Sequence, residues 1–239
     1  PLAAAALAQL LRASEGASIE AGLVQESLVY SMLQAGPEFA AWCARRGPPR
    51  LRPPPKGPAV LAVREGDRLH VTLARPEKRN AFSSAMRDGL VEALRVAACD
   101  AAIREIVLEG QGPAFCSGGD LDEFGTLPDP ATAHLVRTTR SAARLLAATG
   151  ARVHARVHGA CVGAGVELPA FAGRVTARAD ASFWLPELSL GLVPGAGGTV
   201  SLPRRIGRQR TAWLALSGQA IDARTALAWG LVDALDEAR

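Results

Sequence analysis

The sequence predicts an α/β domain that is preceded by a short N-terminal helical segment. From about residue 59 onward, short apolar runs typical of strands alternate with runs whose apolar residues recur at helical spacing. Residues 1–46 show only the helical type of pattern, and residues 47–58 contain six prolines in twelve positions. Because proline interrupts helices and central strands, we expect a helical extension over 1–46, a semi-rigid linker over 47–58 and the α/β domain over 59–239.

The N-terminal segment is rich in alanine and leucine, which both favour helix. We expect its helical part to bury a face that carries Leu23, Leu28, Met32 and Leu33. A break follows at Gly36-Pro37, because this pair of residues is typical of a turn.

The elements of the α/β domain are predicted from apolar periodicity and from β-branched content. The expected strands cover residues 60–63, 69–73, 106–108, 153–157 and 174–177. The expected helices cover residues 84–98, 131–148, 163–171, 211–216 and 223–228. Strands that alternate with helices in this way favour a sheet whose faces are covered by helices.

The bulk composition excludes several classes of protein. Of the 239 residues, 49% are hydrophobic and 21% are charged, which is ordinary for a soluble globular protein. The net charge of +4 is dispersed without a run of five basic residues, so we expect no nucleic-acid partner. No apolar stretch reaches 18 residues, so we expect no membrane span. The isolated Cys43, Cys99, Cys116 and Cys161 match no metal or disulfide framework and fit a reducing, cytoplasmic location.

Three glycine-rich turns occur at residues 115–120, 158–167 and 194–199. Glycine lets the backbone come close to a ligand, and the start of a helix presents free N–H groups. Two converging turns of this kind would stabilise a developing oxyanion; the alternative is that the glycines serve only tight turns. Dinucleotide binding is disfavoured, because the G-x-G that begins at Gly163 meets Leu168 where a third glycine belongs.

Two glutamates stand among apolar residues. Glu167 lies in the first turn of the helix expected after the second glycine-rich turn, and Glu187 follows Leu185-Pro186. Apolar surroundings raise the pKa of a carboxyl group, so a pair of this kind could hold one water molecule and exchange protons with it near neutral pH. The alternatives are that Glu167 stabilises a helix dipole and that Glu187 is a rim residue of a turn.

Other catalytic motifs are not present in the sequence. G-x-S-x-G is absent, so no serine nucleophile of that type is predicted. His154 and His158 lie at a predicted strand without a nearby pair of carboxylates, and we expect both to be structural or surface residues and not metal ligands.

The glycine-rich turns and the two glutamates belong to an ordered series of motifs. Together, residues from about 59 to 235 resemble the enoyl-CoA hydratase/isomerase (crotonase) superfamily in both the order and the spacing of these motifs. The matching segments are Arg75–Ala81, Ala114–Leu121, His158–Leu168, Pro186–Thr199, Leu216–Gly218 and Ala226–Asp233.

The resemblance implies a spiral of ββα turns that assembles as trimers or dimers of trimers, with a role in fatty acid metabolism. It implies that the N–H groups of Gly119 and Ala164 form an oxyanion hole around the thioester oxygen, and that Glu167 and Glu187 add water reversibly to a 2-enoyl-CoA. Coenzyme A is then part of the substrate, and no further cofactor is expected. The positions expected to contact the acyl-CoA are Arg79, Ala81, Ser117, Gly118, Gly119, Asp120, Leu121, Gly163, Trp184, Pro186 and Gly195.

The sequence departs from the family pattern at several places. Ala164 stands where glycine is commoner, and Trp184 stands where a smaller residue is usual, so that its indole is expected to reshape the acyl pocket. Family members usually continue with C-terminal helices over the site, and we expect the helices within residues 1–46 to take over part of that covering role. The resemblance also leaves open an enoyl-CoA isomerase, a lyase of secondary metabolism and, in a different class, a non-catalytic acyl-CoA-binding partner subunit.

Overall fold

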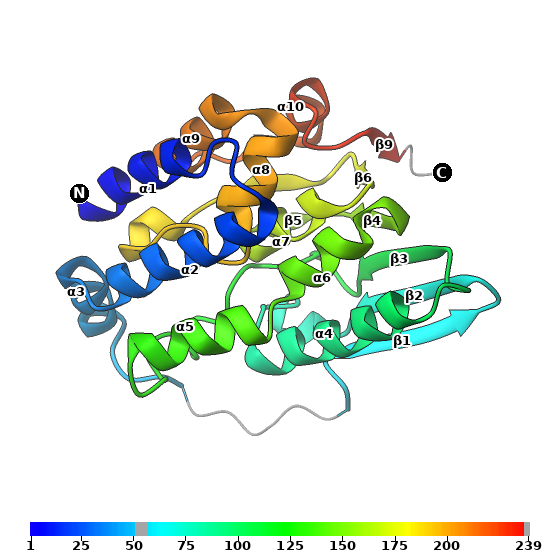
Figure 1. Cartoon of the computed structure of the whole chain (residues 1–239), viewed down its shortest axis with the longest axis horizontal. Coiled ribbons are helices and arrows are strands. Elements are labelled where there is room, and N and C mark those ends of the chain that lie inside the picture. The colour runs from blue at the N-terminus through cyan, green and yellow to red at the C-terminus, as the bar shows by residue number, and fades with distance from the viewer. Residues whose placement is uncertain (51–56, 237–239) are drawn as a thin grey trace.

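The computed structural model describes residues 1–50 and 57–236. In the described residues most strands form one twisted sheet, helices cover it, and a smaller second sheet lies beside it (Figure 1). This mixed α/β architecture confirms the predicted fold class. The middle of the predicted proline-rich linker, residues 51–56, lies outside the described residues.

The N-terminal segment is helical, as predicted. Its helices are α1 (Leu2–Ala13), α2 (Ile19–Gln34) and α3 (Pro37–Arg46). The side chain of Ser18 accepts a hydrogen bond from the Ala21 N–H and so caps α2, and Pro37 occupies the first turn of α3, where its missing N–H costs nothing. The predicted break at Gly36-Pro37 is therefore confirmed.

The buried face of α2 differs from the predicted one. Leu23 and Leu33 are buried, but Leu28 and Met32 are 53% and 58% exposed. The buried positions include Glu26, Ser27 and Ser31 instead. Apolar periodicity misplaces this face because its inward contacts are hydrogen bonds of polar side chains, which the pattern of apolar residues does not reveal.

The larger sheet has the strand order β1-β2-β3-β4-β6-β9. The first two strands pair antiparallel around Gly66, which takes a φ of 64°, and every later neighbour pairs parallel. The strands are β1 (Val60–Glu65), β2 (Arg68–Leu73), β3 (Glu105–Gly110), β4 (Val153–Val157), β6 (Arg174–Arg178) and β9 (Ala234–Asp236).

The second sheet has the order β5-β7-β8, with β5 (Ala160–Val162), β7 (Ser182–Trp184) and β8 (Ile221–Asp222). Its strands follow or precede strands of the larger sheet in the chain: β4 leads into β5, and β6 leads into β7. The chain therefore passes from one sheet to the other and then into a helix, repeatedly. This passage places the turns after β5 and β7 side by side, and the site is built there.

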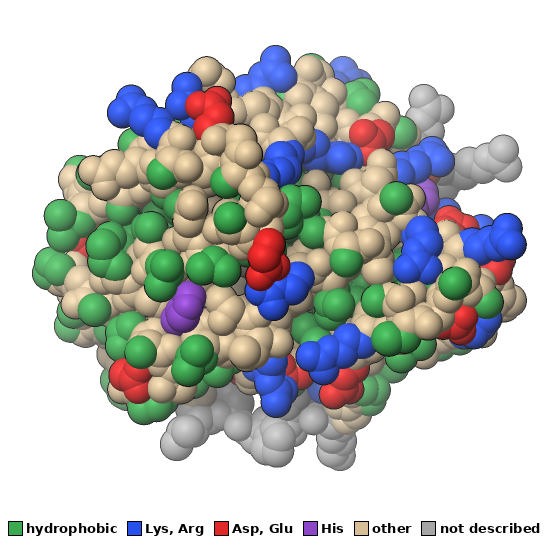
Figure 2. All heavy atoms as spheres, viewed as in Figure 1, with side chains coloured by type: hydrophobic (Ala, Val, Ile, Leu, Met, Phe, Trp, Pro, Cys, Tyr) green, Lys and Arg blue, Asp and Glu red, His purple; other side chains and the backbone are tan. Residues whose placement is uncertain are grey.

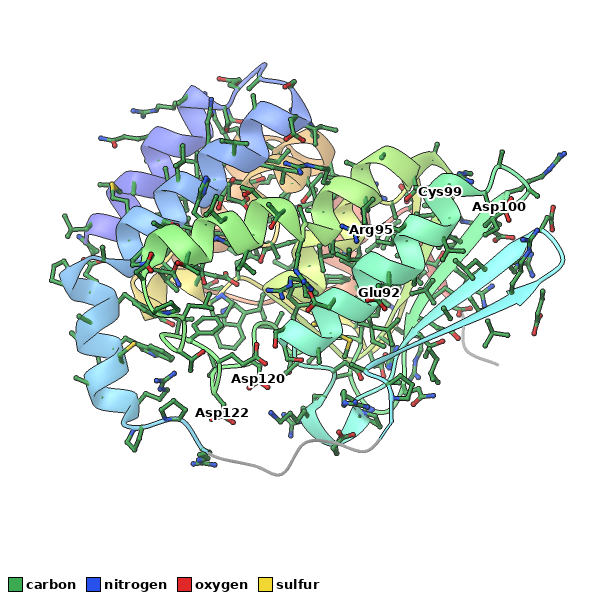
Figure 3. All side chains as sticks on the ribbon, turned by 60° about the horizontal axis from the view of Figure 1, so that its bottom comes forward. Glu92, Arg95, Cys99, Asp100, Asp120 and Asp122 are labelled. Atoms are coloured by element: carbon green, nitrogen blue, oxygen red, sulfur yellow. The ribbon has the colours of Figure 1, made fainter. Side chains whose placement is uncertain are left out.

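The remaining helices cover the sheets. They are α4 (Ser84–Cys99), α5 (Pro130–Thr139), α6 (Ala142–Thr149), α7 (Ala164–Glu167), α8 (Gly198–Ile206), α9 (Arg208–Ser217) and α10 (Ala223–Trp229). Short 3-10 turns complete the chain as η1 (Pro76–Lys78), η2 (Gly150–Arg152), η3 (Pro169–Phe171) and η4 (Glu187–Leu190). The face of α4 that points away from the sheet carries Glu92, Arg95 and Cys99 (Figure 3).

Two of the predicted helices differ in the structure, because one is divided into two helices and the other ends earlier. The helix expected over 131–148 is divided at Ser141, whose side chain accepts from the Arg144 N–H and starts α6. The helix expected over 163–171 ends at Glu167, because Pro169 lacks the N–H that would continue it. Four short strands (β5, β7, β8 and β9) and helix α8 carry no sufficient apolar pattern and were not predicted.

The N-terminal helices pack against the α/β part and share its hydrophobic core. In Figure 1, α1 and α2 lie beside α8 and α9, and α2 also lies along α5. Arg144 on α6 pairs with Glu20 on α2 at 2.5 Å and adds a contact at the surface. On the face shown in Figure 2, Lys and Arg side chains lie next to Asp and Glu side chains, in agreement with the dispersed charge. No helix in the described part of the chain is long and apolar enough to cross a membrane.

The shared core leads to a prediction for the stability of the N-terminal segment. Leu7 on α1 is fully buried, so Leu7→Ala is expected to lower the free energy of unfolding by about 2–5 kcal/mol. Leu2→Ala on the same helix is the control, because Leu2 is 55% exposed and is expected to cost far less. Urea unfolding followed by circular dichroism measures both. Equal midpoints for the two variants would show that α1 is not part of the cooperative core.

Candidate active site

A cavity of about 450 Å³ opens between the N-terminal helices and the turns that follow β5 and β7. Its walls combine residues that are far apart in the sequence, including Tyr30, Phe39, Phe124, Glu167 and Glu187. Of the predicted site residues, those that line the cavity are Gly119, Asp120, Ala164, Glu167, Glu187 and Gly195. The structure thus brings the two predicted catalytic glutamates and the two predicted oxyanion residues to one place.

Glu167 is the last residue of α7 and is 2% exposed. Its Oε2 accepts hydrogen bonds from the backbone N–H groups of Ala196 at 2.7 Å and Gly198 at 2.8 Å. A side chain on Gly198 would displace this carboxyl group, because a Cβ atom there would lie 2.6 Å from Glu167 Cγ. The third glycine-rich turn therefore serves as the support of this carboxyl group, a role more specific than the helix-dipole alternative.

Glu187 begins the 3-10 turn η4, which follows β7 after Leu185 and Pro186. Its Oε2 is buried and has no hydrogen-bond partner in the described residues. Its Oε1 lies so near the backbone of Gly163 that a Cβ there would be 2.3 Å away. Gly163 takes a φ of 49°, so glycine is favoured at this position both by backbone conformation and by the approach of the carboxylate. Glu187 is thus half-buried as a residue, and its carboxyl group forms part of the cavity wall.

Burial dominates the ionisation of both glutamates. It raises the pKa of Glu187 to about 8, with a further contribution from the charge of Glu26. Burial, followed by the charge of Glu187, raises the pKa of Glu167 well above its ordinary value, although two backbone N–H groups favour its ionised form. Since each charge disfavours the other, the pair titrates as a unit and keeps a proton at neutral pH. One carboxyl can then act as an acid while the other acts as a base.

The raised pKa of Glu187 has a consequence for stability. An unfolded glutamate ionises near pH 4.5, whereas folded Glu187 retains its proton up to about pH 8. Between these values the unfolded state binds fewer protons, so the free energy of unfolding falls as the pH rises. Glu187→Gln removes this effect, and we expect the variant to be more stable than the wild type at pH 8 by on the order of a few kcal/mol. This prediction is tested by the urea unfolding midpoints of both proteins at pH 5 and pH 8. If the variant were more stable than the wild type by the same amount at both pH values, the raised pKa would be contradicted.

The oxyanion candidates lie on separate turns that meet at the cavity. Gly119 follows Gly118, whose φ of 88° turns the chain, and Ala164 is the first residue of α7. Among the described residues, neither N–H donates to a protein acceptor. Ala164 is 4% exposed, so its methyl group occupies space at the wall while its N–H remains available. Two unpaired N–H donors on one cavity wall are suited to stabilise a negative oxygen.

Most of the predicted contact residues do not line the cavity. Asp120 is one that does; it pairs with Lys78 at 2.6 Å and donates its N–H to the Phe82 carbonyl. Figure 3 shows Asp120 and Asp122 on one loop, near the N-terminal end of α4. The members of the predicted set that do not line the cavity are Arg79, Ala81, Ser117, Gly118, Leu121, Gly163, Trp184 and Pro186. Their contact with a coenzyme A moiety stays a prediction.

Trp184 differs from its expected role in the acyl pocket. Its side chain is 41% exposed, and it is not among the residues that line the cavity. Its backbone has a different function, because the Trp184 carbonyl accepts the Gly163 N–H at 2.9 Å and ties β7 to the turn after β5. The indole therefore does not reshape this cavity.

The contacts of the two histidines agree with the expectation that they are structural or surface residues, because both are half-buried. His154 Nε2 lies 2.8 Å from Thr176 Oγ1, and His158 Nε2 lies 2.9 Å from the Gly112 carbonyl. Neither lines the cavity. The described residues contain no group of three or more His, Cys, Asp or Glu side chains placed to hold a metal ion.

The N-terminal helices cover the cavity, as the sequence led us to expect. Their contributions to its wall are Tyr30, Gln34, Phe39, Ala40 and Cys43. Arg137 on α5 also lines the cavity, and its guanidinium carbon lies 4.5 Å from the centre of the Tyr30 ring.

Tyr30, Arg137 and Glu26 are not predicted as functional residues from the sequence. The one available signal was the spacing of Glu26, Tyr30 and Gln34, which places polar groups on one helical face.

Comparisons with known proteins point to one family. A family model described as enoyl-CoA hydratase/isomerase matches residues 66–238. A 2,3-dehydroadipyl-CoA hydratase of Escherichia coli (strain K12) is 38% identical over 173 residues, which are 72% of this chain and 67% of that protein. A 1,2-epoxyphenylacetyl-CoA isomerase of the same organism is 36% identical over 178 residues, with 72% and 68% covered.

Solved structures resemble the same part of the chain. The crystal structure of an enoyl-CoA hydratase from Thermoplasma volcanium GSS1 superimposes with a TM-score of 0.68 at 34% identity, covering 77% of this chain and 73% of that one. An enoyl-CoA hydratase from Mycobacterium smegmatis gives a TM-score of 0.67 at 32% identity, with 75% and 70% covered.

Proposed function

Because the chain belongs to the enoyl-CoA hydratase/isomerase family, we propose that it adds water reversibly across the double bond of a 2-enoyl-CoA thioester. The observation that carries this proposal is the meeting of Glu167 and Glu187 in one cavity with the N–H groups of Gly119 and Ala164. A family member that needs a single base has no use for two buried carboxyls whose charges oppose each other.

In the proposed reaction the thioester carbonyl accepts hydrogen bonds from the Gly119 and Ala164 N–H groups. Attack by water on Cβ drives electrons toward that oxygen, and each donor of this kind contributes about 3–4 kcal/mol to the stability of the enolate. One glutamate takes a proton from the attacking water as the C–O bond forms. The other glutamate delivers its proton to Cα when the enolate collapses, and the charge of the pair is conserved.

The acyl chain is proposed to extend from the glutamates toward the N-terminal helices. Tyr30, Phe39, Phe82, Phe124 and Leu127 give this part of the cavity an aromatic and aliphatic wall. Trp42 stacks on Phe39 at 5.8 Å between ring centroids and tilts against Phe124 at 5.9 Å, so it supports the wall from behind. An apolar acyl group suits these surroundings.

The proposal is tested with 2-enoyl-CoA substrates of increasing chain length. Hydration removes the conjugated double bond, so the absorbance of the enoyl thioester is expected to fall with time. No loss of absorbance on any chain length would refute the hydratase. An isomerase instead moves the double bond of a 3-enoyl-CoA into conjugation, raises the absorbance, and is expected to tolerate Glu167→Gln with only a mild loss of rate.

A further inference from the structure

A third buried carboxyl group lies next to the catalytic pair. Glu26 on α2 is 2% exposed, and it precedes the residues 66–238 that match the family model. The proposed reaction gives it no role. A buried carboxyl group is costly unless hydrogen bonds compensate for its loss of water, so its partners indicate what it does.

Glu26 binds the same turn that supports Glu167. Its Oε1 accepts from the Gly197 N–H at 2.7 Å, and its Oε2 accepts from the Thr199 N–H at 2.9 Å and from Thr199 Oγ1 at 2.7 Å. In the same turn, the N–H groups of Ala196 and Gly198 donate to Glu167. Four successive N–H groups thus alternate between two carboxylates that approach the turn from different helices.

We infer that Glu26 is a positioning residue of the active site, through which the N-terminal segment fixes the turn that holds Glu167. This inference rests on the proposed function and adds a residue to it. The turn cannot move away from Glu26 without also withdrawing the Ala196 and Gly198 donors from Glu167. Tyr30 lies one helical turn further along α2 and packs against the start of the same turn, because a Cβ on Gly195 would lie 2.3 Å from its ring.

The charge of Glu26 also acts on the pair. It raises the pKa of both Glu167 and Glu187, while burial raises its own pKa to about 7 against the hydrogen bonds of Thr199 and Gly197. Arg137 is the cation that offsets this charge. The titratable or charged groups that face Glu26 are Glu167 on α7, Glu187 on η4, Arg137 on α5, Arg87 on α4, Arg140 before α6 and Tyr30 on its own helix.

The test replaces Glu26 by glutamine, which has the same shape but puts an NH₂ group where one accepting oxygen was. We expect kcat for a 2-enoyl-CoA to fall about tenfold or more, with KM within about threefold, because Glu167 is misplaced while the substrate wall is kept. The acid limb of the kcat profile is expected to shift toward lower pH, since a negative charge beside the pair is gone. A purely structural cap would lower Tm without moving the pH profile.

Two further variants provide a control and a second test of the role of Glu26. Glu20→Gln makes the same chemical change on the same helix, where the side chain is 58% exposed, and is expected to leave kcat and the pH profile unchanged. Thr199→Val removes one donor to Glu26 and keeps both carboxyls, so it is expected to change kcat and the pH profile in the same direction as Glu26→Gln and by less. This second variant keeps the test available if Glu26→Gln fails to fold. Wild-type kcat and an unshifted profile in Glu26→Gln, or in Thr199→Val if only that variant folds, would overturn the inference.

A failure of the proposed function can be told apart from a failure of this inference. If the wild type hydrates no 2-enoyl-CoA, the hydratase is refuted, and Glu26 is then tested by carboxyl titration with ¹³C-labelled glutamate. Glu26→Gln is expected to lower the pKa of Glu167 and Glu187. Unchanged titration of both groups would overturn the role of Glu26, whatever the reaction.

Discussion

Replacing Glu187 by glutamine is expected to lower kcat for hydration of a 2-enoyl-CoA by roughly a thousandfold, the middle of the range that general acid–base catalysis supplies. Glutamine fills the same space but neither takes nor gives a proton. The Oε2 atom of Glu187 is buried and has no hydrogen-bond partner among the described residues, so it is available to a water molecule or a substrate. Since the wall of the cavity is unchanged, Kd for a saturated acyl-CoA is expected to stay within about threefold of the wild-type value.

The measurement pairs steady-state kinetics with calorimetric titration of the saturated acyl-CoA. Glu92→Gln is the control, because Glu92 lies on the outer face of α4 (Figure 3) and the same substitution there is expected to leave kcat unchanged. A kcat for Glu187→Gln within tenfold of the wild type would remove Glu187 from the chemistry. A large rise in Kd with little change in kcat would instead make it a binding residue.

The two glutamates of the proposed catalytic pair could be predicted from the sequence, but not how they are brought together. Glu167 and Glu187 each stand out as a carboxyl group among apolar neighbours. They meet because β5 and β7 pair in parallel, with Val162 opposite Trp184, and because the Gly163 N–H donates to the Trp184 carbonyl. Strands of three residues carry too little periodicity to be recognised, so the contact that assembles the site has no signal in the pattern of apolar residues.

The position of the N-terminal segment beside the cavity could be predicted from the sequence, but the buried face of α2 could not. In agreement with the expectation that its helices cover the site, Tyr30 and Phe39 line the cavity. The expectation that Leu28 and Met32 face the core is wrong, and Glu26 faces it instead. A helical face that makes its contacts through hydrogen bonds looks solvent-exposed in a sequence, because polar side chains are ordinarily exposed. Buried polar residues of this kind become visible only when their partners, here Gly197 and Thr199, are known.

Glycine at 198 is expected to be needed for activity more than for folding. Gly198 begins α8 without a positive φ, so alanine suits its backbone and is the better helix former. A Cβ there would lie 2.6 Å from Glu167 Cγ and 2.8 Å from its Oε2, so the carboxyl group must move. We expect Gly198→Ala to lower kcat by about 10- to 100-fold, because a displacement of this order in a reacting group has that cost. Tm is measured on the same preparation, so that a loss of stability can be distinguished from a loss of activity.

A double-mutant cycle identifies the cause of that loss. If the new methyl group acts only by displacing Glu167, then Gly198→Ala has no further effect once Glu167 has been replaced by glutamine, since the proton-transferring group is already absent. If the two losses multiply instead, the methyl group disturbs something else, such as the Gly197 and Thr199 contacts to Glu26. Gly89→Ala on α4 is the control for the glycine-to-alanine change, because the nearest atom to its Cβ would be Val60 Cβ at 3.1 Å, and neither residue lines the cavity. Non-additivity in the cycle, with an unaffected control, would show that the support of Glu167 by this turn, and not the mere presence of two glutamates, sets the rate.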